Sequence, residues 1–568
     1  MDTRKTRNIT KTFFKAVSTG SVADVLEILK KTKPSDQVKI ANSFNTEGET
    51  PLVVAIRGNH QEMFQFLVDE LKADIFKSGR FNWKGIDYEE ALPLFVAILS
   101  DCTSNQYFIN FIVSKTLIDV KAAVSILKCF AKFNKKSQAE KIKMVELMGA
   151  AYSFPLQGVR ELDGIYLGIH CWIFALKLRD LHSALSSNSS FLKTPTILSE
   201  SAQKVFGRTT EFRTLEELHA NRYQRNSVML FQTQALLVIQ RITSQIDPDP
   251  NPFFLHCLCR FLISKSSYPS LNQSSLDVTL LILELLHSRQ WKGVIDYDWY
   301  ENIVWDALNP IKNFHLLNPH PHRTQLLFDG FMDVVNHITD LVFQLQKHPD
   351  PLQNDKARKF VAFIVRNIKM FAELGKETSP AFRKWLADYI KFTNSHPGVY
   401  TVLHHLVTNI WSTVEVYSLS PFSTKIFQLF INGKADSNAQ DGFGNTPLHL
   451  LAMKNNFSEF SAEIKFLLDV GAHLDLSNND GFTPLDYLKD LKNHLELKGF
   501  VPDPFLLELT RTVLPLSCLS AQVIRQNSIP FENKKLPPVI ISFIQRHSSR
   551  TASHGIKVKF CRGFFQIL

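Results

Sequence analysis

The sequence predicts an all-α protein, an elongated α-solenoid in which short helices stack side by side. Apolar residues recur every three or four positions through long stretches such as residues 276–286, a spacing that places them on one face of a helix. Glycine is scarce, with 22 among 568 residues, and the string Thr-Pro-Leu returns near both ends of the chain. A string that recurs at separated positions is typical of a repeat protein, whose units stack into an array.

The first Thr-Pro-Leu string lies within residues 48–68. Thr50 is suited to cap a helix that begins at Pro51, and the small Ala55 is suited to a packed interior. A Gly-Asn-His turn and a second apolar helix follow, which are the features of an ankyrin repeat. Degenerate copies lie on either side, so we predict N-terminal ankyrin repeats over residues 1–135.

The string is most specific near the other end, where residues 446–449 read Thr-Pro-Leu-His. A later copy begins at residue 480, and an earlier, eroded copy begins at Val402. Successive copies are spaced more widely than the standard repeat of about 33 residues, so we expect insertions between their helices. We predict C-terminal ankyrin repeats over residues 393–510.

Residues 136–392 lack the Thr-Pro-Leu string but are dense in apolar residues at helical spacing. Helices are predicted in four segments, at residues 165–181, 231–242, 278–291 and 359–374. Helices stacked on helices favour a tetratricopeptide-like helical region between the two sets of ankyrin repeats.

The charge and the cysteines limit the classes of partner. The net charge is +10, but Lys and Arg are scattered, so no nucleic-acid partner is expected. Residues 276–286 are interrupted by acids and are too short to span a bilayer, and the first residues contain no apolar leader. Seven cysteines without a disulfide framework favour a reducing compartment. We therefore expect no membrane partner and a cytoplasmic protein, with the nucleus as a second compartment.

Catalytic motifs are not found, which predicts a protein that is not an enzyme. The one tight cluster, His256 with Cys257 and Cys259, is too crowded to build a tetrahedral metal site, and its apolar neighbours favour buried cysteines in a helix. His404 and His449 occupy the histidine position of the repeat string and are expected to form local hydrogen bonds. No catalytic residue, metal or cofactor is predicted.

Two short amphipathic segments follow the last repeat, at residues 514–524 and 536–544. In each segment the apolar residues recur at helical spacing. The pair either caps the stack of repeats or forms the stripe by which the protein holds a partner. The residues alone leave both interpretations open.

These two segments, the C-terminal repeats and residues 206–241 together resemble the Fem family, the protein fem-1 homologues. The resemblance runs in order along nearly the whole chain. It implies a VHL-type box at residues 511–547, similar to the box of the von Hippel–Lindau protein, that binds elongin B/C and cullin-2. The last segment, residues 548–568, extends beyond the usual end of the family and is treated as a tail.

The resemblance also implies the residues that contact each partner. Those implied for elongin are Leu514, Cys518, Leu519 and Val523. Those implied for cullin-2 are Leu536, Pro537, Ile540 and Ile544. Gln522 stands where the usual motif has an aliphatic residue, four positions after the cysteine.

A function follows from the resemblance: the substrate-recognition subunit of a cullin-2 RING E3 ubiquitin ligase. Such a subunit transfers nothing itself and holds a target protein near the ligase, so that the target is ubiquitinated and degraded by the proteasome. The alternative is a non-catalytic ankyrin-repeat adaptor without ligase coupling.

Members of the family bind the C-terminal degrons of their substrates in the N-terminal ankyrin repeats. The present chain has fewer of these repeats, and Asn82 stands where the family has an acid. Phe95 replaces a family tryptophan, and Asp87 is a nearby acid that could take over the lost charge. Asn82, Asp87 and Phe95 are therefore the candidate degron-binding residues, without an expectation of specificity for a terminal arginine.

Overall fold

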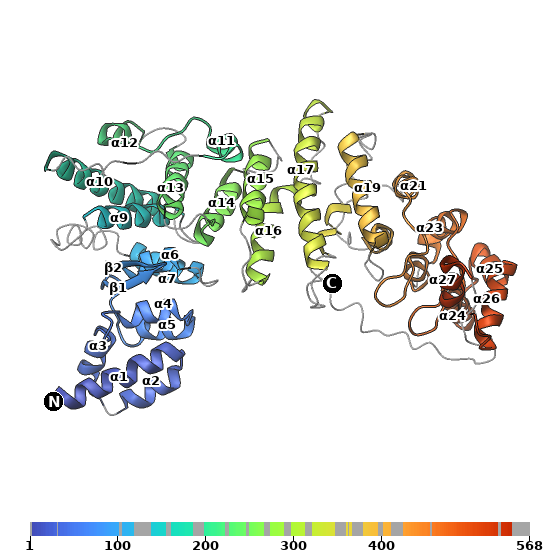
Figure 1. Ribbon diagram of the computed structural model, residues 1–568, viewed down its shortest axis with the longest axis horizontal. Coiled ribbons are helices and arrows are strands. Elements are labelled where there is room, and N and C mark those ends of the chain that lie inside the picture. Colours follow the sequence, from blue (N-terminus) through green and yellow to red (C-terminus); the bar gives the residue numbers. More distant parts are fainter. Residues whose placement is uncertain are drawn as a thin grey trace. The chain divides into compact units, whose positions relative to one another are not determined.

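The computed structural model divides into two compact units, Met1–Gly330 and Phe331–Leu568, and each is built from packed helices (Figure 1). The structure describes residues 3–30, 32–100, 105–118, 138–154, 161–185, 193, 198–221, 227–245, 249–265, 273–288, 297–312, 321–346, 359–361, 363–365, 379–395, 401–409, 424–454, 457–531 and 536–547. The predicted tail, residues 548–568, lies outside this set.

The first unit begins with stacked helix pairs, which confirm the ankyrin architecture. Its first helices are α1 (Thr3–Thr19), α2 (Val22–Leu29), α3 (Pro34–Ala41), α4 (Pro51–Arg57), α5 (Gln61–Asp69), α6 (Pro93–Leu99) and α7 (Asn105–Ile118). The pairs α1–α2, α4–α5 and α6–α7 pack together, and α4 contacts both α1 and α6. As predicted, the Thr50 hydroxyl accepts a hydrogen bond from the Val53 amide, Pro51 opens α4, and Ala55 is buried.

A β-hairpin precedes α6, and the all-α prediction missed it. Strand β1 (Gly79–Trp83) pairs antiparallel with β2 (Ile86–Ala91). Lys84 and Gly85 form the two-residue turn, with φ of 47° and 84°. Positive φ at both turn residues suits the right-handed twist of a hairpin, which explains why a tight turn forms here.

The remainder of the first unit is helical. Its helices are α9 (Gln138–Tyr152), α10 (Glu161–Leu185), α11 (Glu200–Phe206), α12 (Leu215–Asn221), α13 (Ser227–Ser244), α14 (Pro252–Lys265), α15 (Gln273–Ser288), α16 (Tyr297–Lys312) and the first part of α17 (Pro321–Gln346). The predicted helices at 165–181 and 231–242 lie within α10 and α13. The one predicted at 278–291 lies in α15, except for its last three residues, which are outside the described set. Of the segment 359–374, only 359–361 and 363–365 are described, and they are helical.

The second unit contains the C-terminal repeats and the two segments that follow them. Its helices after α17 include α19 (Pro380–Ser395), α20 (Val402–Asn409), α21 (Thr424–Asn432), α22 (Pro447–Ala452), α23 (Phe457–Asp469), α24 (Pro484–Leu497), α25 (Pro504–Arg511), α26 (Leu516–Gln526) and α27 (Pro538–Arg546). Helix α22 contacts α20, α23 and α24, as expected of neighbouring repeats. Among the helices that the structure describes, none is long and apolar enough to cross a membrane.

The histidines of the repeat string join one repeat to the next. In α22, His449 Nδ1 accepts a hydrogen bond from the Thr446 amide, and Nε2 lies 3.0 Å from the Phe482 carbonyl oxygen. His404 makes the equivalent contact, 2.9 Å from the Asn445 carbonyl oxygen. Within its own turn, His404 Nδ1 also accepts a hydrogen bond of 3.2 Å from the Thr401 amide. The bonds from Thr446 and Thr401 are the local hydrogen bonds predicted for the two histidines.

Candidate functional site

Helices α26 and α27 pack against each other through a small apolar core of their own. Ala521 and Ile544 are buried in it together with Phe531 from the connecting segment. Four partly buried side chains complete this core: Ile524, Leu536, Ile541 and Phe543. Prolines at positions 515 and 537 immediately precede the two helices, where the fixed φ of proline suits a helix start. The predicted box therefore folds as a helix pair.

The residues predicted to contact elongin and cullin-2 divide into exposed and buried sets. The exposed ones are Leu519, Val523, Pro537 and Ile540, while Leu514 and Leu536 are half-buried. Cys518 and Ile544 are buried. Six of the eight side chains therefore reach solvent, and the other two face the interior.

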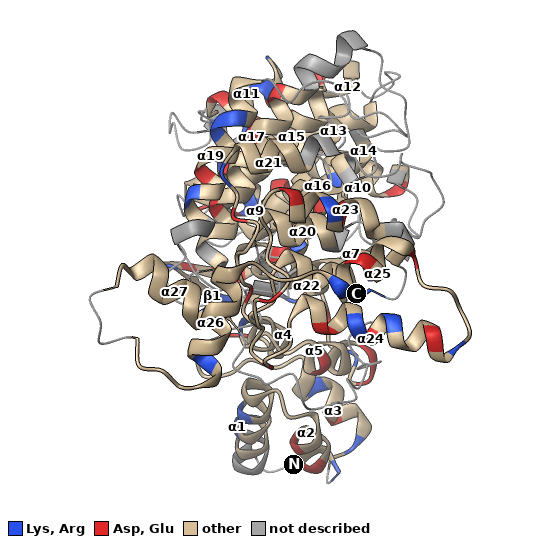
Figure 2. Ribbon diagram, turned by 90° about the vertical axis from the view of Figure 1, so that its right-hand side faces the viewer, with Lys and Arg blue, Asp and Glu red and all other residues tan. Residues whose placement is uncertain are grey.

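Helix α26 carries an exposed apolar stripe, defined by Leu516, Leu519 and Val523. Their exposed fractions are 79%, 37% and 51%. The spacings of three and four residues place them on one side of the helix. Sequence reasoning omitted Leu516, although its spacing to Leu519 carried the signal. In Figure 2 the ribbons of α26 and α27 are almost entirely tan, because each helix has only one charged residue, Arg525 or Arg546.

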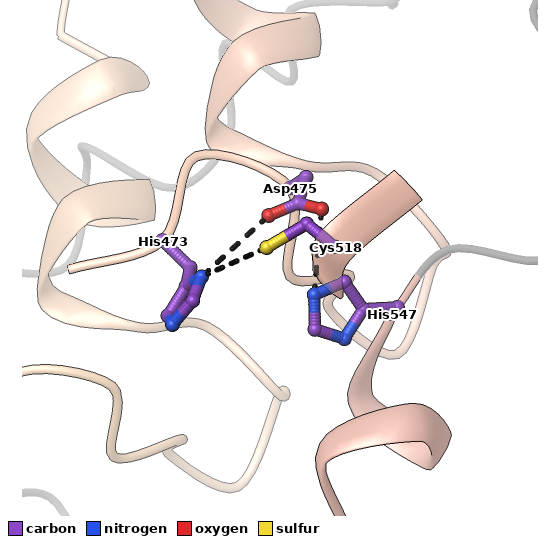
Figure 3. A group of neighbouring side chains, drawn as sticks. All are labelled: His473, Asp475, Cys518 and His547. Carbon is purple, nitrogen blue, oxygen red and sulfur yellow. Dashed lines mark hydrogen bonds and ion pairs between the residues drawn. The ribbon is translucent and has the colours of Figure 1, made fainter. Parts of the chain in front are cut away.

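Cys518 points away from this stripe, into a polar cluster with His473, Asp475 and His547 (Figure 3). Its Sγ lies 3.2 Å from His473 Nδ1. Burial, and secondarily the Asp475 carboxylate, raise the pKa of the Cys518 thiol to about 12. Gln522 belongs to the same inner face, since its Nε2 donates a hydrogen bond of 3.0 Å to Asp475 Oδ2. This contact explains why a polar residue stands at a position where an aliphatic one was expected.

The candidate degron-binding residues lie on and beside the hairpin. Asn82 and Asp87 face each other across the strands, and Asn82 Nδ2 donates a hydrogen bond of 2.7 Å to Asp87 Oδ1. Both are exposed, and Arg80 Nη2 lies 3.9 Å from Asp87 Oδ2. Phe95 is buried and packs edge-to-face on Tyr88, with ring centroids 5.1 Å apart. The structure thus brings Asn82 and Asp87 together at the surface and places Phe95 in the core, against Tyr88.

The cysteines singled out in the central region are structural. Cys257 and Cys259 are buried in α14. Burial is the main cause that raises the pKa of each thiol, so both remain protonated at neutral pH. Burial also lowers the pKa of the neighbouring His256 to about 4. A neutral imidazole and two protonated thiols in an apolar helix fit the packing role predicted for this cluster.

Two family models match the chain. One describes an ankyrin repeat and covers residues 47–79, and the other describes ankyrin repeats in three copies and covers residues 419–496. Together with the stacked helix pairs, these matches show that the chain contains ankyrin repeats in both units.

Curated relatives give the more specific similarity. The chain is similar to protein fem-1 homolog A-A of Mus musculus, with 26% identity over 39% of the chain and 32% of that protein. It is also similar to protein fem-1 homolog C of Xenopus laevis and of Homo sapiens, in each case with 22% identity over 72% of the chain and 61% of the relative. The resemblance to fem-1 homologues is thereby confirmed, and the matches span 32% to 61% of the length of these relatives.

Proposed function

We propose that this ankyrin-repeat protein is the substrate-recognition subunit of a cullin-2 RING E3 ubiquitin ligase. The ankyrin repeats hold the target protein, while α26 and α27 hold elongin B/C and cullin-2. The protein contributes no reacting group, and ubiquitin reaches the target because the target is held near the ligase.

The exposed stripe on α26 carries this proposal. Leu516, Leu519 and Val523 place apolar surface in water at the end of the chain where the resemblance implies the elongin-binding helix. An amphipathic helix that keeps one apolar face on its own domain and a second face exposed fits a helix-in-groove contact with a partner. Ile540 and Pro537, exposed at the start of α27, fit a neighbouring contact with cullin-2.

The alternative, an adaptor without ligase coupling, is favoured by one observation. The resemblance implies that Cys518 contacts elongin, yet Cys518 is buried against His473 in the free chain. If the contact requires this thiol, α26 must rotate on binding. If the exposed stripe alone is sufficient to bind elongin, α26 does not need to rotate.

A pull-down with elongin B/C tests the proposal and separates the alternatives. We expect Leu519→Asp combined with Val523→Asp to abolish retention of elongin B/C, because two charges replace apolar contacts at the interface. Leu497→Asp is the matched control, since Leu497 is an exposed leucine at the end of α24. Equal retention by the stripe variant and the control would contradict the proposal, and no retention by the unmodified chain would favour the adaptor.

We infer that the hairpin contributes to the binding of target proteins. The Asn82–Asp87 pair presents one carboxylate and one amide at the surface beside the N-terminal repeats. A carboxylate in this position suits a basic group of a target peptide. Binding of a target that is unchanged by Asp87→Asn would exclude this site.

A further inference from the structure

We propose that His473, Asp475, Cys518 and His547 form a structural zinc site that fastens α26 and α27 to the C-terminal ankyrin repeats. This inference does not depend on the ligase function. No metal was predicted from the sequence, in which these four residues are dispersed over three segments and match no metal-binding motif.

The four side chains converge on one point (Figure 3). One ligand atom from each residue can be chosen so that all four lie within 4.8 Å of one another. His473 Nδ1 lies 3.2 Å from Cys518 Sγ and 3.9 Å from Asp475 Oδ1, and His547 Nε2 lies 3.4 Å from Asp475 Oδ2. Tetrahedral zinc with bonds of about 2.0–2.3 Å requires ligand atoms roughly 3.2–3.8 Å apart, so only small side-chain movements are needed.

Two buried atoms in this cluster have no hydrogen-bond partner. They are Asp475 Oδ1 and His547 Nε2, and both residues are almost completely buried. A buried polar atom without a partner costs free energy, so such atoms usually indicate a missing ligand or proton. Both of these atoms belong to residues of the proposed ligand set.

The orientation of His547 identifies the nitrogen that binds. Its Nδ1 lies 2.6 Å from the Phe543 carbonyl oxygen, and a carbonyl can only accept, so Nδ1 carries the proton. In the neutral ring, Nε2 therefore presents a lone pair toward the Asp475 carboxylate. The lone pairs of His547 Nε2 and Asp475 Oδ2, 3.4 Å apart, repel each other unless a cation lies between them. A histidine fixed by a carbonyl on its second nitrogen is a recurrent arrangement in metal sites.

Charge balance favours a divalent ion. A zinc ion would displace the proton of the Cys518 thiol on binding, and the released proton passes to water. Asp475 and the resulting thiolate then carry two negative charges in a buried place, and one Zn²⁺ neutralises both. Two imidazoles, one thiolate and one carboxylate are borderline ligands that suit zinc in tetrahedral geometry. Gln522, bonded to Asp475 Oδ2, would orient the carboxylate from outside the site. His473 is partly exposed, which gives the ion a path of entry.

The position of the site indicates a structural role, because its ligands come from three parts of the second unit. His473 and Asp475 lie in the loop between α23 and α24, Cys518 lies in α26, and His547 directly follows α27. The backbone already links the same parts, because the Ser477 amide donates a 2.9 Å hydrogen bond to the Arg546 carbonyl. A site with four protein ligands leaves no open position for substrate, as in structural zinc centres.

Metal analysis of the purified full-length chain, expressed with added zinc, is the first test. We expect one zinc per chain, lost in His547→Ala and in Cys518→Ala, and retained in His494→Ala, which changes an exposed histidine of α24. Zinc content of the His547→Ala variant equal to that of the unmodified chain would overturn the proposal.

Cobalt exchange tests the unmodified chain and keeps the proposal falsifiable if the variants do not fold. After zinc is removed with a chelator, Co²⁺ should produce the intense visible bands of a tetrahedral site and a thiolate-to-cobalt charge-transfer band in the near ultraviolet. A chain that binds neither zinc nor Co²⁺ would overturn the site, as would a cobalt spectrum without the thiolate band.

Discussion

The buried carboxylate of Glu146 in α9 connects three helices of the first unit. Its Oε2 lies 2.9 Å from Arg179 Nη2 of α10 and 2.7 Å from Arg241 Nη2 of α13. Arg241 also pairs with Glu211, with Nε 2.7 Å from Oε1. A buried charge is stable only when it is paired and hydrogen-bonded, and here every charge has a partner.

Replacing this carboxylate should weaken the first unit considerably. We expect Glu146→Gln to lower the free energy of unfolding by about 3–5 kcal/mol, because two buried guanidinium groups lose a charge partner. Urea unfolding followed by circular dichroism measures the change. Glu200→Gln, which removes an exposed pair with Lys204, should change it by less than about 1 kcal/mol. Equal effects of the two substitutions would contradict the importance of the network.

The stabilisation that Glu146 contributes should depend on pH. The two arginines and Lys193 hold the pKa of Glu146 at about 2, although burial alone would raise it. Because the folded-state pKa is depressed, its stabilisation is fully present above pH 4.5 and is lost as the pH falls toward 2. The difference in stability between the unmodified chain and Glu146→Gln should therefore shrink over this range. A difference that is constant from pH 6 to pH 3 would contradict the assignment.

The stability of the C-terminal repeats should also depend on pH, because of His449. Burial lowers its pKa to about 4, and Nδ1 accepts from the Thr446 amide, so only the neutral ring fits. The stabilisation is present above about pH 6.5 and is lost as the pH falls toward 4. We expect His449→Ala to cost about 1–3 kcal/mol at pH 7.5 and less at pH 5, measured by urea unfolding. His494→Ala is the control, and a cost independent of pH would refute this explanation.

At the scale of elements, the hairpin depends on the close approach of Gly79 to the start of α4. A Cβ at this position would lie 2.9 Å from the Thr50 backbone nitrogen. We expect Gly79→Ala to destabilise the first unit by about 1–3 kcal/mol, because backbone must move to accept the methyl group. Glu89→Ala, at an exposed position of β2, is the control for urea unfolding. Similar stabilities of the two variants would show that the contact is not restrictive.

Elements with a strong local signal were predictable from the sequence. Thr50-Pro51 and Thr446-Pro447 mark helix starts by capping chemistry that acts within one turn, and the structure has helices at both. The hairpin was missed because its turn, Lys84-Gly85, is a weaker signal than Asn-Gly.

The orientation of α26 could not be predicted in the same way. Leu514 with Cys518, and Leu516 with Leu519 and Val523, are both compatible with one face of a helix. Two distant contacts determine which face of α26 turns inward. Cys518 contacts His473, 45 residues earlier in the chain, and Gln522 bonds to Asp475, 47 residues earlier. Local periodicity carries no information on such distant contacts. The polar cluster went unnoticed for the same reason.

In the proposed function, the whole chain holds a target and a ligase at once. Repeat proteins suit this task because they offer extended surface without a catalytic cleft. The stripe on α26 and the exposed start of α27 lie on helices that follow the last repeat in the chain. Loss of ligase binding should therefore leave the repeats folded, and stripe variants should unfold at the same urea concentration as the unmodified chain.

The most direct measurement is co-expression of the full chain with elongin B/C and the cullin-2 N-terminal domain, followed by size exclusion with light scattering. We expect a stoichiometric complex of all four proteins, lost in the Leu519→Asp, Val523→Asp variant and kept in Leu497→Asp. A monodisperse chain that elutes alone would contradict it and would assign α26 and α27 to capping the repeats.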